Sequence, residues 1–132
     1  MTAEDKIQVL LADDRLVFRE VLRTRLEATG RIEVIGEGED GREAVDLALS
    51  LEPDIVVMDI KMPNMNGLQA IEQLRAMRPQ LKVIVLSAHA SKEYERRCRR
   101  LGVWGYVLKS APSAELVRVV EAAHQGIRSL SE

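Results

Sequence analysis

The sequence predicts a single α/β domain in which a doubly wound, five-stranded parallel sheet is covered by five helices. Short apolar runs alternate five times with longer segments whose apolar residues recur at helical spacing. Apart from Glu33 in the second run, the short runs are apolar throughout, which is typical of strands that are buried on both faces. The length of 132 residues fits one domain of this kind and allows a substantial core.

The order of the elements follows from these runs. Strands are predicted near residues 9–11, 32–35, 55–58, 83–86 and 105–108. The helical faces are Phe18, Val21, Leu22 and Leu26; Ala44, Val45 and Ala48; Leu68, Ile71 and Leu74; Tyr94, Cys98 and Leu101; and Leu116, Val119, Val120 and Ala123. Capping-box pairs are Asp40 with Glu43 and Asn66 with Gln69, and predicted helix stops are Gly30, Pro53, Pro79 and Gly126.

Composition narrows the function classes. A net charge of −2 argues against bulk electrostatic binding to nucleic acid, so any DNA role would belong to another domain. No apolar stretch predicts a membrane span and no signal peptide is apparent, so we expect a cytoplasmic protein without membrane contact. The single Cys98 cannot form an internal disulfide. We expect it to be a small core residue, although the arginines around it would lower its pKa if it were exposed.

Acidic side chains follow two of the predicted strands. Asp59 ends the third apolar run, and Asp13 and Asp14 end the first. If the two strands are neighbours in a parallel sheet, the carboxylates converge at its carboxyl edge, where open α/β sheets bind ligands. They would repel one another unless a hard divalent cation lay between them. The sequence therefore predicts a magnesium site beside a reactive aspartate.

The fourth and fifth runs end in groups that suit a phosphoryl oxygen. Ser87 follows one run and Lys109 follows the other, which predicts a hydroxyl and an ammonium at the edge that carries the carboxylates. Each residue alone has an ordinary explanation, such as a strand end, an ion pair or a helix cap. The combination at one edge favours phosphoryl chemistry.

At this point the sequence resembles the response-regulator receiver domains of two-component signalling, the CheY-like family. The resemblance lies in Asp13-Asp14, the segment 59–67 (DIKMPNMNG), Ser87-Ala88 and the segment 105–109 (GYVLK). It is nearest to the NarL/FixJ-type branch. It implies a flavodoxin-like fold with strand order 2-1-3-4-5, a receiver domain over residues 1–128, and at 129–132 the start of a linker to a possible helix-turn-helix output domain that is absent from this chain.

The resemblance also implies roles for individual residues. Asp59 would be the phosphoacceptor, and the metal ligands would be Asp14, Asp13, often through water, Asp59 itself and the backbone carbonyl of Lys61. Lys109 and Ser87 would contact the phosphoryl group, while Ser87 and the aromatic Tyr106 would form the switch. In many receivers Thr stands where this chain has Ser87, which keeps the hydroxyl but loses a stiff β-branched side chain.

The implied partners are a sensor histidine kinase, a second copy of the chain after phosphorylation, and DNA only through an output domain. The chain would not be a classical enzyme: it would catalyse its own phosphorylation, from phosphohistidine or an acyl phosphate, and its own dephosphorylation. The expected function is a phosphorylation-switched receiver that controls a transcriptional regulator.

The predicted helix near residues 91–101 has the weakest apolar face, and we interpret it as a candidate moving part, although its charges also fit an ordinary solvated face. Arg96, Arg97 and Arg100 belong to its arginine cluster, and Trp104 follows it. Trp104 either covers arginine stems or anchors a partner on the output face. We favour the anchor, since Trp and Arg are enriched in binding hot spots.

Three alternatives compete with this function, and the sequence disfavours the last two. The first is a stand-alone phosphorelay or partner-binding receiver without a DNA-binding output. The second is a flavodoxin-like binding module, which would need a Gly- or hydroxyl-rich loop after the first strand instead of Asp13-Asp14-Arg15. The third is a phosphatase with an aspartyl nucleophile, which would want an acid where this chain has Lys61.

Overall fold

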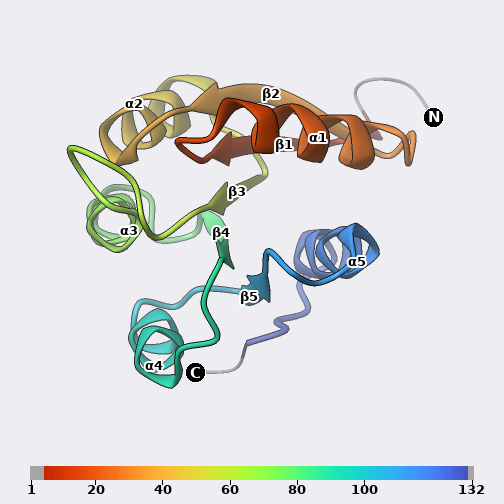
Figure 1. The fold of residues 1–132 in the computed structure, drawn as a ribbon. Helices are drawn as coiled ribbons and strands as arrows, with labels where there is room; N and C mark the ends of the chain where they lie inside the picture. The colour runs from red at the N-terminus through yellow and green to blue at the C-terminus, as the bar shows by residue number, and fades with distance from the viewer. Residues whose placement is uncertain (1–4, 131–132) are drawn as a thin grey trace.

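A computed structural model describes residues 5–130, so Ser131 and Glu132 of the predicted linker lie outside the described residues. Strands and helices alternate along the chain (Figure 1). The strands are β1 (Ile7–Ala12), β2 (Ile32–Gly38), β3 (Ile55–Met58), β4 (Lys82–Ser87) and β5 (Gly105–Leu108). The helices are α1 (Leu16–Glu27), α2 (Gly41–Leu51), α3 (Gly67–Met77), α4 (Lys92–Arg100) and α5 (Ser113–His124).

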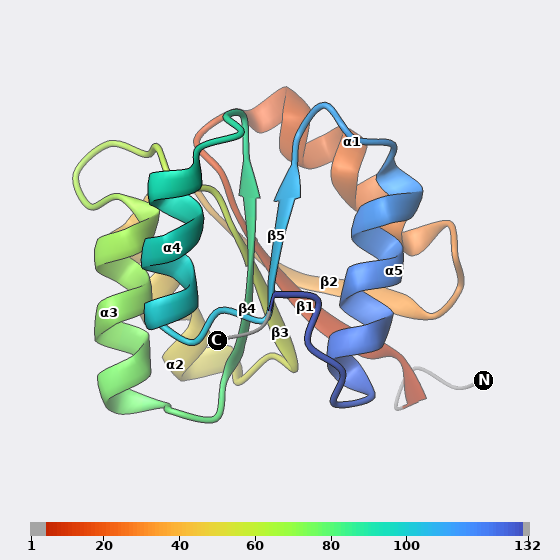
Figure 2. The same ribbon diagram turned by 90° about the horizontal axis from the view of Figure 1, so that it is seen from below.

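The five strands form one parallel sheet, as the sequence pattern predicted, in the order β2-β1-β3-β4-β5 that the resemblance implied. Helices α1 and α5 cover one face, and α2, α3 and α4 cover the other (Figure 2). Successive strand residues point to opposite faces, so Val9 and Leu11 pack on the α1/α5 side while Leu10 packs on the other. Both faces of the central strands are therefore buried, which explains why their sequences are apolar throughout.

Strand β2 is longer than its apolar run. The run ends at Ile35, but the strand continues to Gly38 because residues 36–38 pair with residues 10–12 of β1 after a register shift between Val9 and Leu10. The added residues, Gly-Glu-Gly, contribute backbone pairing rather than an apolar side chain. Hydrophobic patterning does not detect such an extension.

Most of the predicted helix boundaries are confirmed. Asn66 and Gln69 form both bonds of a capping box at the start of α3. Asp40 caps α2 by accepting from the Glu43 backbone N–H, but the Glu43 carboxylate accepts from the Glu39 N–H instead of closing the box on Asp40. Helix ends are followed by Gly30 and Gly126, at φ of +75° and +88°, and by Pro53 and Pro79.

The core accounts for most of the predicted apolar residues, with one exception on α1. Leu22 and Leu26 face the sheet, whereas Val21 is 47% exposed. Cys98 is fully buried, and desolvation raises its pKa to about 11, so the structure excludes the reactive thiol. Packing also continues past residue 128, because Leu130 is buried in the same cluster as Cys98. Within residues 5–130, no helix is both long and apolar enough to cross a membrane.

Candidate functional site

The side chains of the candidate site follow four strands at one edge of the sheet. Asp13 and Asp59 come directly after β1 and β3, Ser87 ends β4, and Lys109 follows β5. Backbone bonds continue the sheet one residue beyond the strands: the Asp59 N–H donates to the Ala12 carbonyl at 2.9 Å, and the Lys109 N–H donates to the Ser87 carbonyl at 2.7 Å. The sheet itself therefore fixes where these side chains begin.

The three carboxylates predicted from the sequence lie together. Asp13, Asp14 and Asp59 each offer an oxygen, and these oxygens lie within 4.8 Å of one another. Asp13 and Asp59 are only 4% and 6% exposed, while Asp14 is open to solvent. Clustered carboxylate oxygens that solvent can reach on one side suit a hard cation such as Mg²⁺. The donor set therefore fits the predicted metal.

Lys109 joins two of these carboxylates. Its Nζ lies 2.5 Å from Asp13 Oδ2 and 3.2 Å from Asp59 Oδ2. Burial raises the pKa of Asp59 above its ordinary value; the nearby Lys109 charge opposes this shift, and the Asp13 charge adds to it. One ammonium thus offsets only part of the cost of holding the carboxylate ionised. An additional cation would complete the charge balance.

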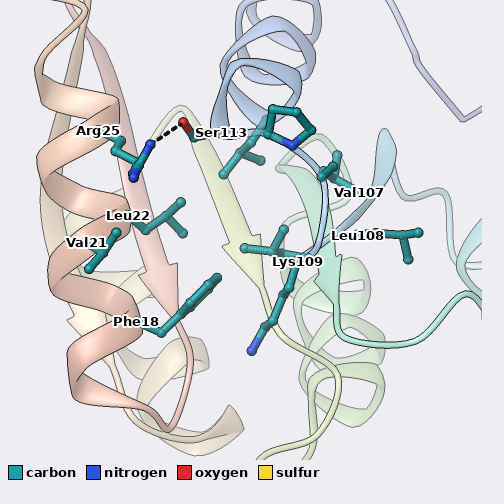
Figure 3. A pocket seen from close by; sticks show the side chains of 12 residues that line it. Phe18, Val21, Leu22, Arg25, Val107, Leu108, Lys109 and Ser113 are labelled. Carbon is teal, nitrogen blue, oxygen red and sulfur yellow. Dashed lines mark hydrogen bonds between the residues drawn. The ribbon is translucent and has the colours of Figure 1, made fainter.

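Two hollows meet at Lys109. The smaller, of about 230 Å³, opens onto the carboxylates and is lined by Asp14, Asp59, Lys61, Ser87, His89 and Lys109, among others. The larger, of about 270 Å³, lies between α1 and α5 (Figure 3). In it the Phe18 ring faces Lys109, whose Nζ lies 4.6 Å from the ring centroid (Figure 3). This cation–π contact supports the lysine from the side away from the smaller pocket.

The predicted switch pair is connected through the loop between β4 and α4. The hydroxyls of Ser87 and Tyr106 both donate to the His89 backbone carbonyl, at 3.2 and 2.8 Å. The His89 N–H in turn donates to the Ser87 oxygen at 3.1 Å. Burial raises the Tyr106 pKa, so the phenol stays protonated as this donor role requires. His89 lines the pocket but is not in the carboxylate group at which a metal would bind.

The loop after Asp59 depends on a glycine that sequence reasoning did not single out as functional. A Cβ on Gly67 would overlap the backbone carbonyl oxygen of Asp59, and the Gly67 N–H donates to the Ile60 carbonyl at 2.8 Å. The loop is also tied to α2, because the Asn64 amide donates to Asp40 at 2.8 Å. Gly67 is the first residue of α3, directly after the Asn66 cap. A glycine directly after a predicted helix cap was the feature of the sequence that could have indicated this close approach.

The output-face candidates occupy two places. Arg96, Arg97 and Arg100 are exposed on α4, and Arg97 lines a hollow that also includes Asp14 and Lys61. Trp104 lies directly before β5, at the end of the strands opposite to their carboxyl edge. Its backbone N–H donates to the Val83 carbonyl. The structure thus separates Trp104 from the pocket that Asp59, Ser87 and Lys109 line.

Trp104 is held between two cations of its own chain. Its ring centroid lies 4.8 Å from Lys82 Nζ and 4.2 Å from Arg128 Cζ. Its backbone carbonyl accepts from the N–H groups of Ser129 and Leu130. The arginine that Trp104 covers is therefore Arg128, which lies after α5 within residues 127–130. It does not belong to the arginine cluster of α4.

Comparisons with known proteins agree with this geometry. Residues 9–121 match the model of the response regulator receiver domain. The chain is 38% identical over 123 residues to the transcriptional regulatory protein DegU of Brevibacillus brevis. This match covers 93% of this chain and 52% of DegU. It is 38% identical over 120 residues to LiaR of Bacillus subtilis, covering 91% of this chain and 57% of LiaR. The chain thus spans just over half the length of these relatives.

Solved structures show the same fold. A two-component response regulator of the LuxR family from Aurantimonas sp. SI85-9A1 superposes with a TM-score of 0.90 at 32% identity, covering 93% of this chain and 88% of that one. The isolated receiver domain of RcsB from Salmonella enterica serovar Typhimurium, solved with the phosphomimetic BeF3⁻, gives a TM-score of 0.86 at 25% identity, covering 93% and 91%. The alternation of buried strands and helices, the acidic edge and these matches over most of the chain place it in the response regulator receiver family, in the company of transcriptional regulators.

Proposed function

We propose that Asp59 is the phosphoacceptor of this receiver domain. The observation that carries the proposal is a carboxylate buried to 6% exposure that still lines an open pocket, with Lys109 within 3.2 Å. A carboxylate oxygen of Asp59 attacks phosphorus, and the bond from phosphorus to the donor's imidazole nitrogen or acyl oxygen breaks. The donor leaves with the electron pair, and an aspartyl phosphate remains.

Asp13, Asp14 and Asp59 would hold the cation, with the backbone carbonyl of Lys61 as a further ligand. Support comes from the three clustered carboxylates and from the position of Lys61 on the pocket wall. When bound there, Mg²⁺ would supply positive charge against the phosphoryl oxygens, which carry the developing charge during transfer. The described site presents oxygen donors, as this ion prefers.

Lys109 and Ser87 stabilise the phosphoryl group once it is in place. The Lys109 ammonium already contacts Asp59, so a short shift away from Asp13 brings it to a phosphoryl oxygen. The Ser87 hydroxyl is a donor on the same pocket wall and leaves the His89 carbonyl to make this contact. Tyr106, which shares that carbonyl, then loses part of its resting arrangement and reorients.

Membership of the receiver family supports this signalling context. A sensor histidine kinase donates the phosphoryl group. The switched surface acts through a second copy of the chain and through a DNA-binding domain, in keeping with the transcriptional regulatory proteins that the chain resembles. We place the protein in the cytoplasm, where these partners of a receiver meet. The receiver catalyses both its phosphorylation and its dephosphorylation with the residues of this one pocket.

Intact mass after incubation with Mg²⁺ and acetyl phosphate tests the assignment. We expect one added phosphoryl group in the wild type and none in Asp59→Asn or in excess chelator. Asp54→Asn is the matched control, because Asp54 precedes the same strand at its opposite end, where its carboxylate accepts from the Gln8 N–H. Labelling of the Asp59→Asn variant would refute Asp59 as the acceptor.

A further inference from the structure

A single arginine is buried together with the functional residues. Four polar or charged side chains are buried within the described part of the chain: Asp13, Arg19, Asp59 and Ser87. Three of them belong to the proposed site. The fourth, Arg19 on α1, is 5% exposed and has no role in the mechanism above. Because burying a guanidinium is costly unless its contacts are specific, its partners indicate what it does.

Arg19 donates to the main chain of the acidic loop. Its Nη1 bonds to the backbone carbonyl oxygen of Asp13. Behind this contact, Nε donates to Glu37 Oε1 at 3.0 Å and Nη2 lies 3.7 Å from Glu39 Oε1. The other oxygen of Glu37 accepts from Arg23 at 3.0 Å. The extended end of β2 and the residue after it therefore hold the guanidinium in place.

The carbonyl that Arg19 holds is that of the peptide joining Asp13 to Asp14. A peptide unit is planar, so fixing its oxygen sets the plane from which the two side chains diverge. The other sides of Asp13 are also fixed, since its N–H donates to the Gly38 carbonyl at 3.0 Å and its Oδ1 accepts from the Arg15 N–H at 2.8 Å. Asp13 then reaches Lys109, while Asp14 is left on the open side of the pocket.

We propose that Arg19 is a positioning residue for the cation site, acting through the Asp13–Asp14 peptide to hold the two carboxylates in binding geometry. Arg19 contacts no substrate and supplies no ligand atom. Its side chain fixes the direction of Asp14, the carboxylate that is otherwise freest to turn. This inference rests on the proposed magnesium-dependent function and adds a residue from outside the pocket to it.

The test compares Arg19→Met with the matched control Arg23→Met. Both variants remove a guanidinium of α1 that contacts Glu37, but only Arg19 bonds to the Asp13 carbonyl. Calorimetric titration with Mg²⁺ gives the dissociation constant, and thermal unfolding in chelator gives the stability without metal. We expect Arg19→Met to weaken Mg²⁺ binding about tenfold, as for the loss of one hydrogen bond from a charged donor, and Arg23→Met to change it less than about twofold.

A third variant, Arg19→Lys, keeps the charge and one donor and is expected to recover part of the lost affinity. Equal Mg²⁺ affinity in Arg19→Met and Arg23→Met would overturn the inference. If Arg19→Met does not fold, the test rests on Arg19→Lys. A folded Arg19→Lys that is less stable in chelator but binds Mg²⁺ with wild-type affinity would likewise overturn the inference. Arg19 would then have a purely structural role. A wild type that does not bind Mg²⁺ would instead contradict the proposed function itself.

Discussion

The hydroxyls of Ser87 and Tyr106 donate to one acceptor, the backbone carbonyl oxygen of His89. Ser87 is also one of the two residues that we assign to the phosphoryl group. When its hydroxyl leaves this carbonyl, the surroundings of Tyr106 change without any direct contact between the phosphoryl group and the ring. The loop between β4 and α4 is therefore the physical link between the pocket and helix α4.

Removing the hydroxyl of Ser87 and removing that of Tyr106 should have different effects on phosphorylation and on the loop between β4 and α4. We expect Ser87→Ala to slow labelling by acetyl phosphate about tenfold, through loss of one charge-assisted hydrogen bond, and to speed hydrogen exchange of the His89 amide. Tyr106→Phe should label at the wild-type rate and leave that amide protected, because the His89 N–H bonds to Ser87. Ser87→Thr, which keeps the hydroxyl, serves as the control. Equal exchange rates in Ser87→Ala and the wild type would contradict the proposed link.

Magnesium should stabilise the fold by ligand linkage. At a concentration tenfold above its dissociation constant, the ion contributes about 1.4 kcal/mol to the free energy of unfolding. We expect the thermal midpoint of the wild type to rise with Mg²⁺ and that of Asp14→Ala not to rise. Asp46→Ala removes one negative charge from the exposed face of α2 and should keep the wild-type response. A full response in Asp14→Ala would mean that this ligand is misassigned.

The raised pKa of Asp59 predicts a pH dependence in chelator. Burial is the largest cause of the shift, and it favours the protonated carboxyl in the folded state. The contribution of Asp59 to the free energy of unfolding is therefore fully present below the ordinary pKa of 3.8. It is lost as pH rises through the higher pKa of the folded state. We expect Asp59→Asn to unfold at a higher temperature than the wild type at pH 7, and this difference to shrink on acidification. A less stable Asp59→Asn at pH 7 would refute this account.

Gly67 should tolerate no side chain. In Gly67→Ala the new methyl overlaps the carbonyl oxygen of Asp59, so the loop or the start of α3 must shift at a cost of about 1–3 kcal/mol. We expect a lower unfolding midpoint together with slower labelling, since the acceptor's own peptide moves. Glu72→Ala, on the exposed face of the same helix, should change neither quantity. Unchanged labelling in a destabilised Gly67→Ala would show that the loop moves without Asp59.

The sequence predicted well which side chains lie at the carboxyl edge of the sheet. Apolar runs show where the strands end, and the side chains that follow parallel neighbouring strands necessarily lie together at that edge. It did not predict contacts between distant elements. Arg19 belongs to an amphipathic helix, where an arginine is normally solvated, and nothing local indicates that its guanidinium reaches the Asp13 carbonyl. The end of β2, Gly-Glu-Gly, was missed for the same reason, since its partners lie in β1.

Trp104 is the residue for which sequence and structure suggest different roles. The sequence favoured a partner anchor, whereas both Lys82 and Arg128 now stack against the ring. Two cation–π contacts of this kind are worth about 1–2 kcal/mol together, so Trp104→Ala should lower the unfolding midpoint while labelling at Asp59 continues. Trp104→Phe, which keeps an aromatic face, should recover much of this loss. Wild-type stability in Trp104→Ala would show that these contacts contribute nothing.

The anchor hypothesis makes an additional prediction about association. If Trp104 binds a second copy of the chain, Trp104→Ala should lose the association that beryllofluoride induces, whereas Arg128→Ala, which removes one of the two cations over the ring, should keep it. Sedimentation of each variant with and without beryllofluoride and Mg²⁺, at a temperature where all are folded, gives the answer. Beryllofluoride-induced association that survives in Trp104→Ala assigns the residue to covering its own cations. The activated surface would then lie elsewhere, for example on α1, where Leu16, Val17 and Val21 are exposed.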